Sequence, residues 1–510
     1  MKTLVIAEKP SVARDIARVL GCSKKENGAL EGNKYIVTWA LGHLVTLKDP
    51  EDYDKKYKEW NMAVLPMMPE KLQIKVIPQT GKQYHAVTTQ LARKDVNEIV
   101  IATDAGREGE LVARWILDKA HNQKPCKRLW ISSVTDKAIR EGFANLKDAK
   151  EYDNLYRAAV SRAEADWLIG INATRALTCK YNAQLSCGRV QTPTLAMIAQ
   201  REQEIREFVP KPYYTVTAAA GGVVYTWKDE KSVGTRISDP EKAKQIAEKA
   251  KRYPLVLQNV EKKKKQKETP LLYDLTELQR DASARFGYSA KQTLNLMQSL
   301  YETHKVLTYP RTDSRYLTKD IVPTLKERLD AVSIGPYKAL AQQAKRSPLN
   351  GKLSFVNDAK VSDHHAIIPT RELQKCNLNE LPKGELAILQ LISTRLFVAV
   401  GDPHRYAETV IELDCGGTAF SAKGKTILHN GWKALVRKSS STKSDEKEPT
   451  LPSVSAGDAM AVISTEIKEG KTSPPKHYTE DTLLQSMETA GADEMPDEVE
   501  RKGLGTPATR

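Results

Sequence analysis

A tyrosine hydroxyl stands two residues before an arginine in the segment Leu307-Thr308-Tyr309-Pro310-Arg311-Thr312-Asp313-Ser314-Arg315. A free tyrosine has a pKa of about 10 and is a poor nucleophile at neutral pH. A guanidinium nearby favours the phenolate and can hold a phosphate oxygen through forked hydrogen bonds. The spacing therefore fits attack of Tyr309 on a phosphodiester, with Arg311 as the cation, although Tyr-Pro-Arg by itself is more often a surface turn.

Acidic residues follow two predicted strands near the start of the chain. Glu8-Lys9 comes directly after the apolar run 4–7, and an acidic loop, residues 103–110, follows the apolar run 99–102. Because the carboxyl ends of parallel strands meet at one edge of a sheet, Glu8, Asp104 and Glu108 are expected to converge. Converging carboxylates repel unless a cation lies between them, and hard oxygen ligands suit Mg²⁺. Together the two loops predict a Mg²⁺ site, whereas either alone would be an ordinary α/β turn.

Three further features carry charged or polar side chains, and each has a plain structural interpretation. Arg162 and Asp166 lie four apart on a predicted helix, which by itself favours an ordinary surface ion pair. The segment 186–191 precedes a helix N-terminus, a position that favours a phosphate, although a capping loop is the plainer interpretation. Two histidines complete the set: His364 lies beside Asp363 and His365, whereas His43 fits a structural role equally well.

Composition limits the class of protein. The chain has 510 residues, too many for one core, and its 40% hydrophobic and 28% charged residues are typical of a folded protein rather than a disordered one. A net charge of +15 makes a polyanionic partner plausible. No apolar run approaches the roughly 20 residues of a membrane span. The cysteines form no C-x-x-C pair, so neither a zinc site nor a disulfide framework is indicated, and reduced thiols in a cytoplasm are expected.

The order of the predicted elements indicates several domains. Strand and helix alternate over about the first 150 residues and predict a parallel α/β unit. Two β-like stretches, 213–227 and 408–420, are far apart in the chain and are expected to pair, which would make the helical region between them an insertion. The charge run 261–268 is expected to be a solvated linker. The helix that opens at Gln191 is expected to bury a stripe of apolar residues: Leu195, Ile198, Ile205 and Phe208.

Five motifs occur here in the order seen in type IA DNA topoisomerases, and the chain resembles that family along its whole length, most closely the bacterial topoisomerase III group. The motifs are Glu8-Lys9, the acidic loop from Asp104 to Glu110, Ser186-Cys187-Gly188-Arg189-Val190-Gln191-Thr192-Pro193, Tyr309-Pro310-Arg311-Thr312-Asp313-Ser314, and His364-His365-Ala366-Ile367-Ile368-Pro369-Thr370.

The resemblance implies a multidomain α/β plus α plus β fold of toroidal shape, with a parallel α/β Toprim domain at the N-terminus. The implied domains are the Toprim catalytic domain over 1–150, a helical DNA-groove domain over 151–210 and 433–510, a β-rich arch over 211–265 and 404–432, and a mostly helical domain with Tyr309 over 266–403. The implied activity is ATP-independent: the enzyme breaks one DNA strand, passes another strand or duplex and rejoins, which relaxes negative supercoils, decatenates DNA, or both. DNA is the implied partner, a helicase is a candidate protein partner, and the implied location is the cytoplasm, in association with the nucleoid.

The resemblance also implies roles for individual residues. Tyr309 resembles the nucleophile that ends linked to a 5′ phosphate, Arg311 a contact to the scissile phosphate, Glu8 the carboxylate beside the leaving 3′ oxygen, and Lys9 a phosphate ligand. Mg²⁺ is the implied cofactor, held by Glu8, Asp104 and Glu108. In the family's Asp-x-Asp-x-Glu pattern the middle acid falls at Gly106, so one acid is missing here. The implied DNA contacts are Ser186, Cys187, Gly188, Arg189, Val190, Gln191, Arg162, Asp166, Trp167, Arg175, His43, Asp313 and His364.

Two other functions fit the same motifs less fully. One is a different Toprim enzyme, such as a primase or a metal-dependent nuclease, in which water or a nucleotide hydroxyl replaces the tyrosine. The other is a non-catalytic nucleic-acid-binding scaffold.

At the other end of the chain, residues 503–510 resemble the start of a helix too short to bury an apolar face. From this we expect a longer polypeptide, without which the Tyr309-bearing domain would be loosely packed.

Overall fold

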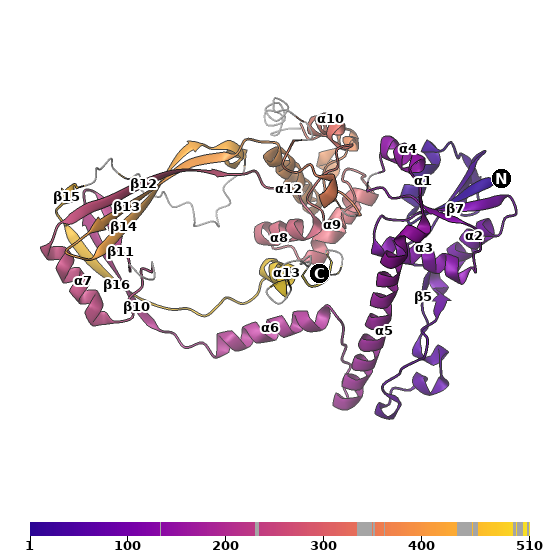
Figure 1. Ribbon diagram of the computed structural model, residues 1–510, viewed down its shortest axis with the longest axis horizontal. Helices are drawn as coiled ribbons and strands as arrows, with labels where there is room; N and C mark the ends of the chain where they lie inside the picture. Colours follow the sequence, from indigo (N-terminus) through magenta and orange to yellow (C-terminus); the bar gives the residue numbers. More distant parts are fainter. Residues whose placement is uncertain are drawn as a thin grey trace.

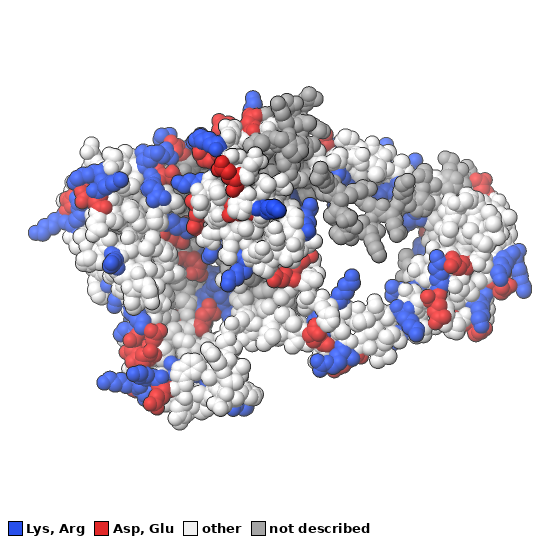
Figure 2. Space-filling view, turned by 180° about the vertical axis from the view of Figure 1, so that it is seen from behind, with Lys and Arg blue, Asp and Glu red and all other residues white. Residues whose placement is uncertain are grey.

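The structure is a computed structural model in which the elements form a ring around a central opening (Figure 1). It describes residues 1–132, 134–229, 234–333, 349, 352–361, 363–435, 451, 457–492, 496, 503–506 and 509. The space-filling view shows the opening from behind, with both basic and acidic side chains along its lower rim (Figure 2). None of the described helices is long and apolar enough to cross a membrane.

A seven-stranded sheet forms the centre of the N-terminal domain, with strand order β2-β3-β4-β1-β7-β8-β9. Its strands are β1 (Lys2–Ala7), β2 (Lys24–Glu26), β3 (Ala29–Glu31), β4 (Tyr35–Trp39), β7 (Val96–Ala102), β8 (Cys126–Arg128) and β9 (Lys147–Asp148). The central strand β1 runs parallel to both β4 and β7. Its residues 3–7 are all buried, as expected of a strand covered on both faces.

Four helices accompany this sheet: α1 (Pro10–Val19), α2 (Gly81–Leu91), α3 (Arg107–Lys119) and α4 (Asp136–Ala144). The register places Ala7 opposite Ala102, so β1 and β7 end side by side. The loops that carry Glu8 and Asp104 therefore leave the sheet at one edge, and this part of the prediction is confirmed.

Two long helices lead away from the N-terminal domain. α5 (Asp153–Tyr181) packs against α3, and α6 (Gln191–Arg206) forms the lower part of the ring in Figure 1. The stripe predicted to be buried on α6 is wrong: no residue of this helix is buried, and Leu195 is 66% exposed. Apolar spacing makes a helix amphipathic, but only a packed neighbour can bury the apolar face.

A second seven-stranded sheet forms the arch at the far side of the ring, with strand order β15-β12-β13-β14-β11-β10-β16. Its strands are β10 (Pro212–Ala220), β11 (Val223–Trp227), β12 (Leu255–Lys267), β13 (His404–Asp414), β14 (Ala419–His429), β15 (Ala459–Met460) and β16 (Ser464–Lys471), and α7 (Pro240–Arg252) packs against it. β11 pairs with β14, so the two β-like stretches do join and the region between them is an insertion.

Two predictions about this region are wrong. The charge run 261–268 is not a linker, because all but its last residue belong to β12, which pairs with β13 along its length. Ion pairing across the strands, as between Lys265 and Glu408, offsets the low β-propensity of lysine. The expected helical segment 433–510 includes β15 and β16, which extend the arch. Much of the rest of that segment, including the helix start expected after Thr506, lies outside the described residues.

The Tyr309 domain (residues 271–400) closes the ring above the opening. It is built from α8 (Leu275–Phe286), α9 (Ala290–Glu302), α10 (Leu325–Ala331) and α12 (Lys383–Ala399) around a core that includes Leu278, Met297 and Ile392. α13 (Glu480–Thr489) packs against α8, where Arg280 donates to Asp481 at 2.7 Å. In Figure 1 this domain lies directly beside the N-terminal domain.

Candidate active site at a contact between two domains

Tyr309 is positioned by two chain segments that lie side by side. The backbone N–H of Thr308 donates to the carbonyl of Ile368 at 3.0 Å, and the Thr312 hydroxyl donates to the carbonyl of His364 at 2.9 Å. Leu307 and Ile368 are buried in the core of the domain. The buried side chains of Leu307 and Ile368 and these hydrogen bonds thus hold the motif that contains Tyr309 against the motif that contains His364.

The ring of Tyr309 lies against side chains of both domains. The His364 ring has its centroid 4.4 Å from that of Tyr309, and Tyr301 makes an edge contact at 5.5 Å. From the N-terminal domain, Lys9 Nζ lies 3.9 Å from the centre of the Tyr309 ring. The candidate nucleophile therefore belongs to one domain and its nearest recorded cation to the other.

Asp104 links the two domains through its carboxylate. Lys9 Nζ donates to Asp104 Oδ2 at 2.7 Å, and His364 Nε2 lies 3.1 Å from the same oxygen. Burial raises the pKa of Asp104, but His364 and Lys9 outweigh it and hold the pKa well below its usual range. Burial likewise lowers the pKa of Lys9, but Asp104 and Glu8 raise it above the ordinary value. Both groups are therefore charged at neutral pH.

Glu8 differs from its neighbour Asp104 in the direction in which its pKa is shifted. Its Oε2 accepts a hydrogen bond from the backbone N–H of Asp104 at 3.1 Å. Burial, and then the negative charge of Asp104, raise the pKa of Glu8 above that of a free glutamate. Two adjacent carboxylates with opposite pKa shifts are suited to separate roles, one holding a proton and one remaining ionised.

Glu108 does not join the other two acids. Its Oε1 accepts a hydrogen bond from Arg162 Nη1 at 2.9 Å, and its Oε2 lies 3.7 Å from His43 Nε2. The hydrogen bond with His43 and the charge of Arg162 lower the pKa of Glu108. The predicted convergence is therefore correct for Glu8 and Asp104 and wrong for Glu108. In the described part of the chain, no three His, Cys, Asp or Glu side chains lie together as a group that could hold a metal ion.

The carboxylates nevertheless supply the hard oxygen donors that Mg²⁺ prefers. Cationic side chains lie on these oxygens: Lys9 and His364 on Asp104, Arg162 and His43 on Glu108. The donor chemistry thus fits Mg²⁺, and Asp104, Glu108 and Glu8 are the residues that would supply its oxygen ligands.

A buried ion pair beneath the acidic loop was not visible in the sequence pattern. Arg128 and Glu110 are both fully buried and bonded to each other. Arg128 also donates to the carbonyls of Thr103 at 2.8 Å and Asp104 at 2.7 Å. It therefore fixes the backbone from which the Asp104 side chain projects. The only signal was Glu110 itself, because a carboxylate in the buried stripe of a helix requires a cation.

Close packing explains why position 109 is a glycine, and the sequence pattern did not reveal this. A Cβ at this position would lie 2.0 Å from the carbonyl oxygen of Asp104. The Thr103 hydroxyl also donates to the carbonyl of Gly109 at 2.7 Å. This glycine thus allows the first turn of α3 to pack against the acidic loop.

The arginine expected beside the Tyr309 hydroxyl lies elsewhere. Arg311 is exposed and donates to Gln298 Oε1 at 3.4 Å, and the cation recorded against Tyr309 is Lys9. Asp313, on the same loop, is also exposed.

The candidate DNA contacts fall into two groups. The exposed group centres on the segment 186–191: Arg189 Nε donates to Asp166 at 2.9 Å, and Thr174 holds Cys187 through two hydrogen bonds. Arg162 and Asp166 do not pair with each other as their spacing suggests, since Arg162 bonds to Glu108 and Asp166 to Arg189.

The second group is buried and has structural partners. Trp167 is 9% exposed and donates to the carbonyl of Lys48 at 2.9 Å. Arg175 is 5% exposed, donates to the carbonyl of Tyr57 and lies over the Trp60 ring. The expectation that Trp167 and Arg175 face DNA is therefore corrected: they support the segment 48–60.

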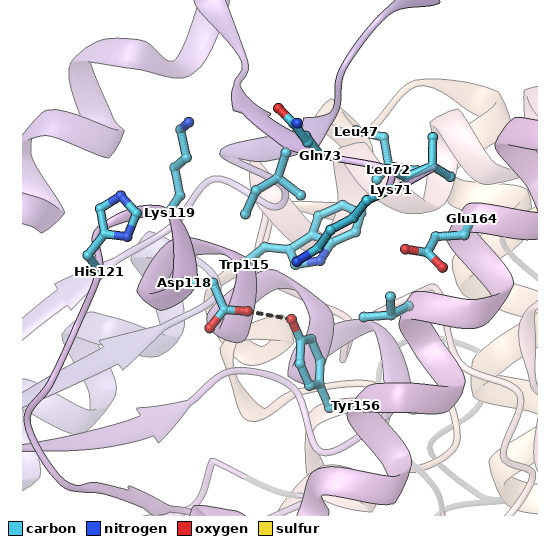
Figure 3. Close-up of a pocket in the computed structure, with 12 residues that line it drawn as sticks. Leu47, Lys71, Leu72, Gln73, Trp115, Asp118, Lys119, His121, Tyr156 and Glu164 are labelled. Atoms are coloured by element: carbon cyan, nitrogen blue, oxygen red, sulfur yellow. Dashed lines mark hydrogen bonds between the residues drawn. The ribbon is translucent and has the colours of Figure 1, made fainter. Parts of the chain in front are cut away.

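A pocket of about 360 Å³ lies elsewhere on the N-terminal domain, between α3, α5 and the small sheet of β5 (Val45–Leu47) and β6 (Ile74–Val76). Its lining includes Trp115, Lys71 and Glu164, and its most defined polar contact is the hydrogen bond from Tyr156 to Asp118 (Figure 3). None of the residues around Tyr309 lines it, so it is separate from the candidate active site.

Comparisons with known proteins identify the family of the chain. The Toprim domain family matches residues 3–134, and the DNA topoisomerase family matches residues 150–510. DNA topoisomerase 3 of Bacillus subtilis (strain 168) is 54% identical over 518 residues, covering 100% of this chain and 71% of the relative, and its counterpart in Bacillus licheniformis is 54% identical over 517 residues with the same coverage. The solved structure of full-length topoisomerase I from Thermotoga maritima shares the fold with a TM-score of 0.65 and 22% identity, covering 99% of this chain and 76% of that one. The chain therefore belongs to the type IA DNA topoisomerases, within the bacterial topoisomerase III group.

Proposed function

We propose that Tyr309 is the nucleophile that breaks one DNA strand. Its phenolic oxygen gives its proton to solvent and attacks a backbone phosphorus, so that a 5′ phosphotyrosine bond forms while the bond from phosphorus to the 3′ oxygen of the neighbouring nucleotide breaks. The observation that carries this proposal is the contact of the Tyr309 ring with Lys9 and His364, directly beside Asp104. One phosphodiester replaces another, so the step is reversible without ATP and the strand can be rejoined after another strand or duplex has passed.

Three neighbouring side chains have separate proposed roles in this reaction. Glu8, with its raised pKa, is suited to give a proton to the leaving 3′ oxygen and to take it back on rejoining. Lys9 is charged and already touches the Tyr309 ring, so it is placed to neutralise the phosphate. Arg311 is exposed on the same loop and donates to the neutral amide of Gln298 at 3.4 Å, a weak contact that its guanidinium can exchange for a phosphate oxygen.

Mg²⁺ is the cofactor we propose for this site, with Asp104, Glu108 and Glu8 as its carboxylate ligands. When bound, it would neutralise phosphate charge near the break and help to hold the two strand ends in line. Asp104 and Glu108 contribute ionised oxygens, because the pKa of each is lowered by its neighbours.

Single-stranded DNA is the proposed occupant of the surface beside the site. The segment 186–191 and Arg162 lie on the helical part that connects to the N-terminal domain, and Arg189 and Arg162 present guanidinium groups there. Such guanidinium groups can hold the phosphate backbone of a single strand when phosphate oxygens replace their carboxylate partners, Glu108 and Asp166. A helicase partner and a cytoplasmic, nucleoid-associated location remain expectations from the resemblance.

The decisive experiment compares Tyr309→Phe with the parent protein. The change removes only the phenolic oxygen, so the ring contacts and single-strand binding should remain within about threefold, while the covalent DNA adduct trapped by denaturant should disappear. Mass spectrometry of the digested parent adduct should place the nucleotide on Tyr309. Supercoil relaxation by pure Tyr309→Phe protein, or an adduct on another residue, would overturn the proposal. A nuclease or primase would yield no adduct with either protein.

A further inference from the structure

A second tyrosine lies beside Tyr309 at the contact between the two domains. Tyr301 is half-buried near the end of α9, and its ring meets the Tyr309 ring edge-on, with centroids 5.5 Å apart and ring planes at 76°. Edge-to-face contact is a favoured arrangement of two aromatic rings, and it is directional. The proposed reaction assigns Tyr301 no role.

The chain between the two tyrosines is anchored in the core of the Tyr309 domain. Leu300, next to Tyr301, is buried, and its carbonyl accepts a hydrogen bond from the N–H of Val306 at 3.0 Å. Val306 and Leu307 belong to the same buried core. The packing of the domain therefore holds the Tyr301 ring against the Tyr309 ring, and the contact does not depend on the two side chains alone.

Tyr301 also has a partner in the N-terminal domain. Ser11, in the first turn of α1 and two residues after Lys9, has its side chain within hydrogen-bonding reach of Tyr301. Burial raises the pKa of Tyr301, and the hydrogen bond with Ser11 opposes that rise only in part. The Tyr301 hydroxyl is therefore protonated at neutral pH, so Tyr301 is a polar contact across the domains and not a second phenolate.

We propose that Tyr301 is a positioning residue: its ring aligns the Tyr309 ring for attack, and its hydroxyl ties that alignment to Ser11, so that the nucleophile is fully aligned only when the two domains are in contact. The inference rests on the proposed function of Tyr309. It adds a residue that acts through Tyr309 rather than on the phosphate.

The alignment has a consequence for both directions of the reaction. Turning the Tyr309 ring moves the phenolic oxygen off the line of attack, and a misplacement of about 1 Å can cost about 100-fold in rate. Breaking and rejoining pass through the same transition state. A residue that only aligns the ring must therefore change both rates by the same factor and leave the equilibrium fraction of covalent adduct unchanged.

Four variants separate the two contacts of Tyr301. Tyr301→Phe keeps the ring and removes the hydroxyl, Ser11→Ala removes the partner, and the double variant removes both. Tyr301→Leu removes the ring edge as well. Tyr288→Phe is the matched control, because Tyr288 lies in the same domain, contacts Phe286 through its ring at 5.3 Å, and precedes α9 at the end opposite to Tyr301.

Cleavage is measured in a single turnover, as the rate at which a labelled oligonucleotide becomes covalently bound. Rejoining is the rate at which an added strand with a 3′ hydroxyl releases the label. Fluorescence anisotropy gives the affinity for uncut oligonucleotide, and thermal melts give the stability of each variant.

The expected losses follow from the contacts removed. A neutral hydrogen bond corresponds to about 2- to 12-fold, so Tyr301→Phe and Ser11→Ala should each slow both reactions by about that factor. The double variant should be no slower than the slower single variant, because the two hydroxyls share one interaction. Tyr301→Leu should lose up to about 100-fold, with affinity and adduct fraction within about twofold of the parent throughout.

Parent rates in both Tyr301→Phe and Tyr301→Leu would overturn the inference. Losses that multiply in the double variant would also overturn it, because Ser11 and Tyr301 would then act separately. A smaller amount of reacting protein at an unchanged rate, or an equal loss in Tyr288→Phe, would show a structural role only and would count against it as well. Each of these results leaves the proposed function intact while the parent forms its adduct on Tyr309, whereas absence of that adduct removes the proposed function itself.

Discussion

Replacing Lys9 by glutamine should remove the cation that connects Tyr309 with the acidic loop. In the structure, Lys9 Nζ donates to Asp104 at 2.7 Å and lies 3.9 Å from the centre of the Tyr309 ring. A hydrogen bond between charged groups contributes about 1.5–3 kcal/mol, and a partly desolvated cation–π contact about 1–2 kcal/mol. The combined loss of about 2.5–5 kcal/mol corresponds to a decrease of roughly 60- to 4000-fold in the equilibrium that these contacts favour.

The equilibrium in question is that between intact and covalently bound DNA. We expect Lys9→Gln to lower the amount of trapped adduct by roughly that factor at saturating single-stranded DNA. Binding itself, measured by fluorescence anisotropy of a labelled oligonucleotide, should change by less than about fivefold, because one phosphate contact among many is lost. The variant should also retain the fold, since Lys9 is not part of a hydrophobic core.

Lys34→Gln is the matched control. Lys34 lies 5.3 Å over the ring of Tyr35 in the same domain, and it is exposed at the start of β4, at the opposite edge of the sheet from Glu8. This change removes a cation–π contact of the same kind without touching the candidate site. An adduct yield for Lys9→Gln within threefold of that for Lys34→Gln would refute the reasoning.

Two other changes probe the scaffold. Arg128→Met removes the fully buried partner of Glu110, which then keeps its longer ion pair with Arg114 at 3.3 Å. The change should lower the free energy of unfolding by up to about 3 kcal/mol in urea titrations, whereas Arg128→Met/Glu110→Leu should recover most of it; equal stability of the single and double variants would contradict this. Burial raises the pKa of Asp274 from 3.8 to about 6, so the stability it contributes is full below about pH 4 and is lost as pH rises through 6. Asp274→Asn retains the cap on Glu277 N–H and should gain up to about 3 kcal/mol on the parent between pH 4 and pH 7 in thermal melts; parallel pH profiles would contradict it.

The meeting of Glu8 and Asp104 at one edge of the N-terminal sheet could be predicted, because it follows from local sequence patterns. Short apolar runs between helices predict parallel strands, and parallel strands place the residues after them together. Glu8 and Asp104 meet for that reason. Glu108 does not meet them, since it already lies on the first turn of α3, where Arg162 and His43 from other elements approach it.

The predictions that are wrong share a different cause. The lysine-rich run 261–267 has low β-propensity, but β13 supplies backbone partners and carboxylates, and pairing overrides propensity. α6 has apolar spacing, but the segment 476–478 contacts it through the polar side chains Arg201 and Glu202, so Leu195 is exposed and the rest of the stripe is only half-buried. Trp167 and Arg175 lie near a family element, the pair Arg162 and Asp166, but the segment 48–60 covers them. In each case the outcome depends on an element distant in the chain, which a local pattern does not contain.

The division of the candidate site between two domains bears directly on the proposed reaction. Tyr309 belongs to one domain, and Glu8, Lys9 and Asp104 belong to the other. Under the proposed function, the 5′ end of the broken strand is bonded to the Tyr309 domain, so it moves with that domain when the two separate. The group suited to proton transfer stays behind with the 3′ end. Rejoining then requires the same contacts among Lys9, Asp104 and His364 that close the domains, so the strand can be resealed only after the opening has closed.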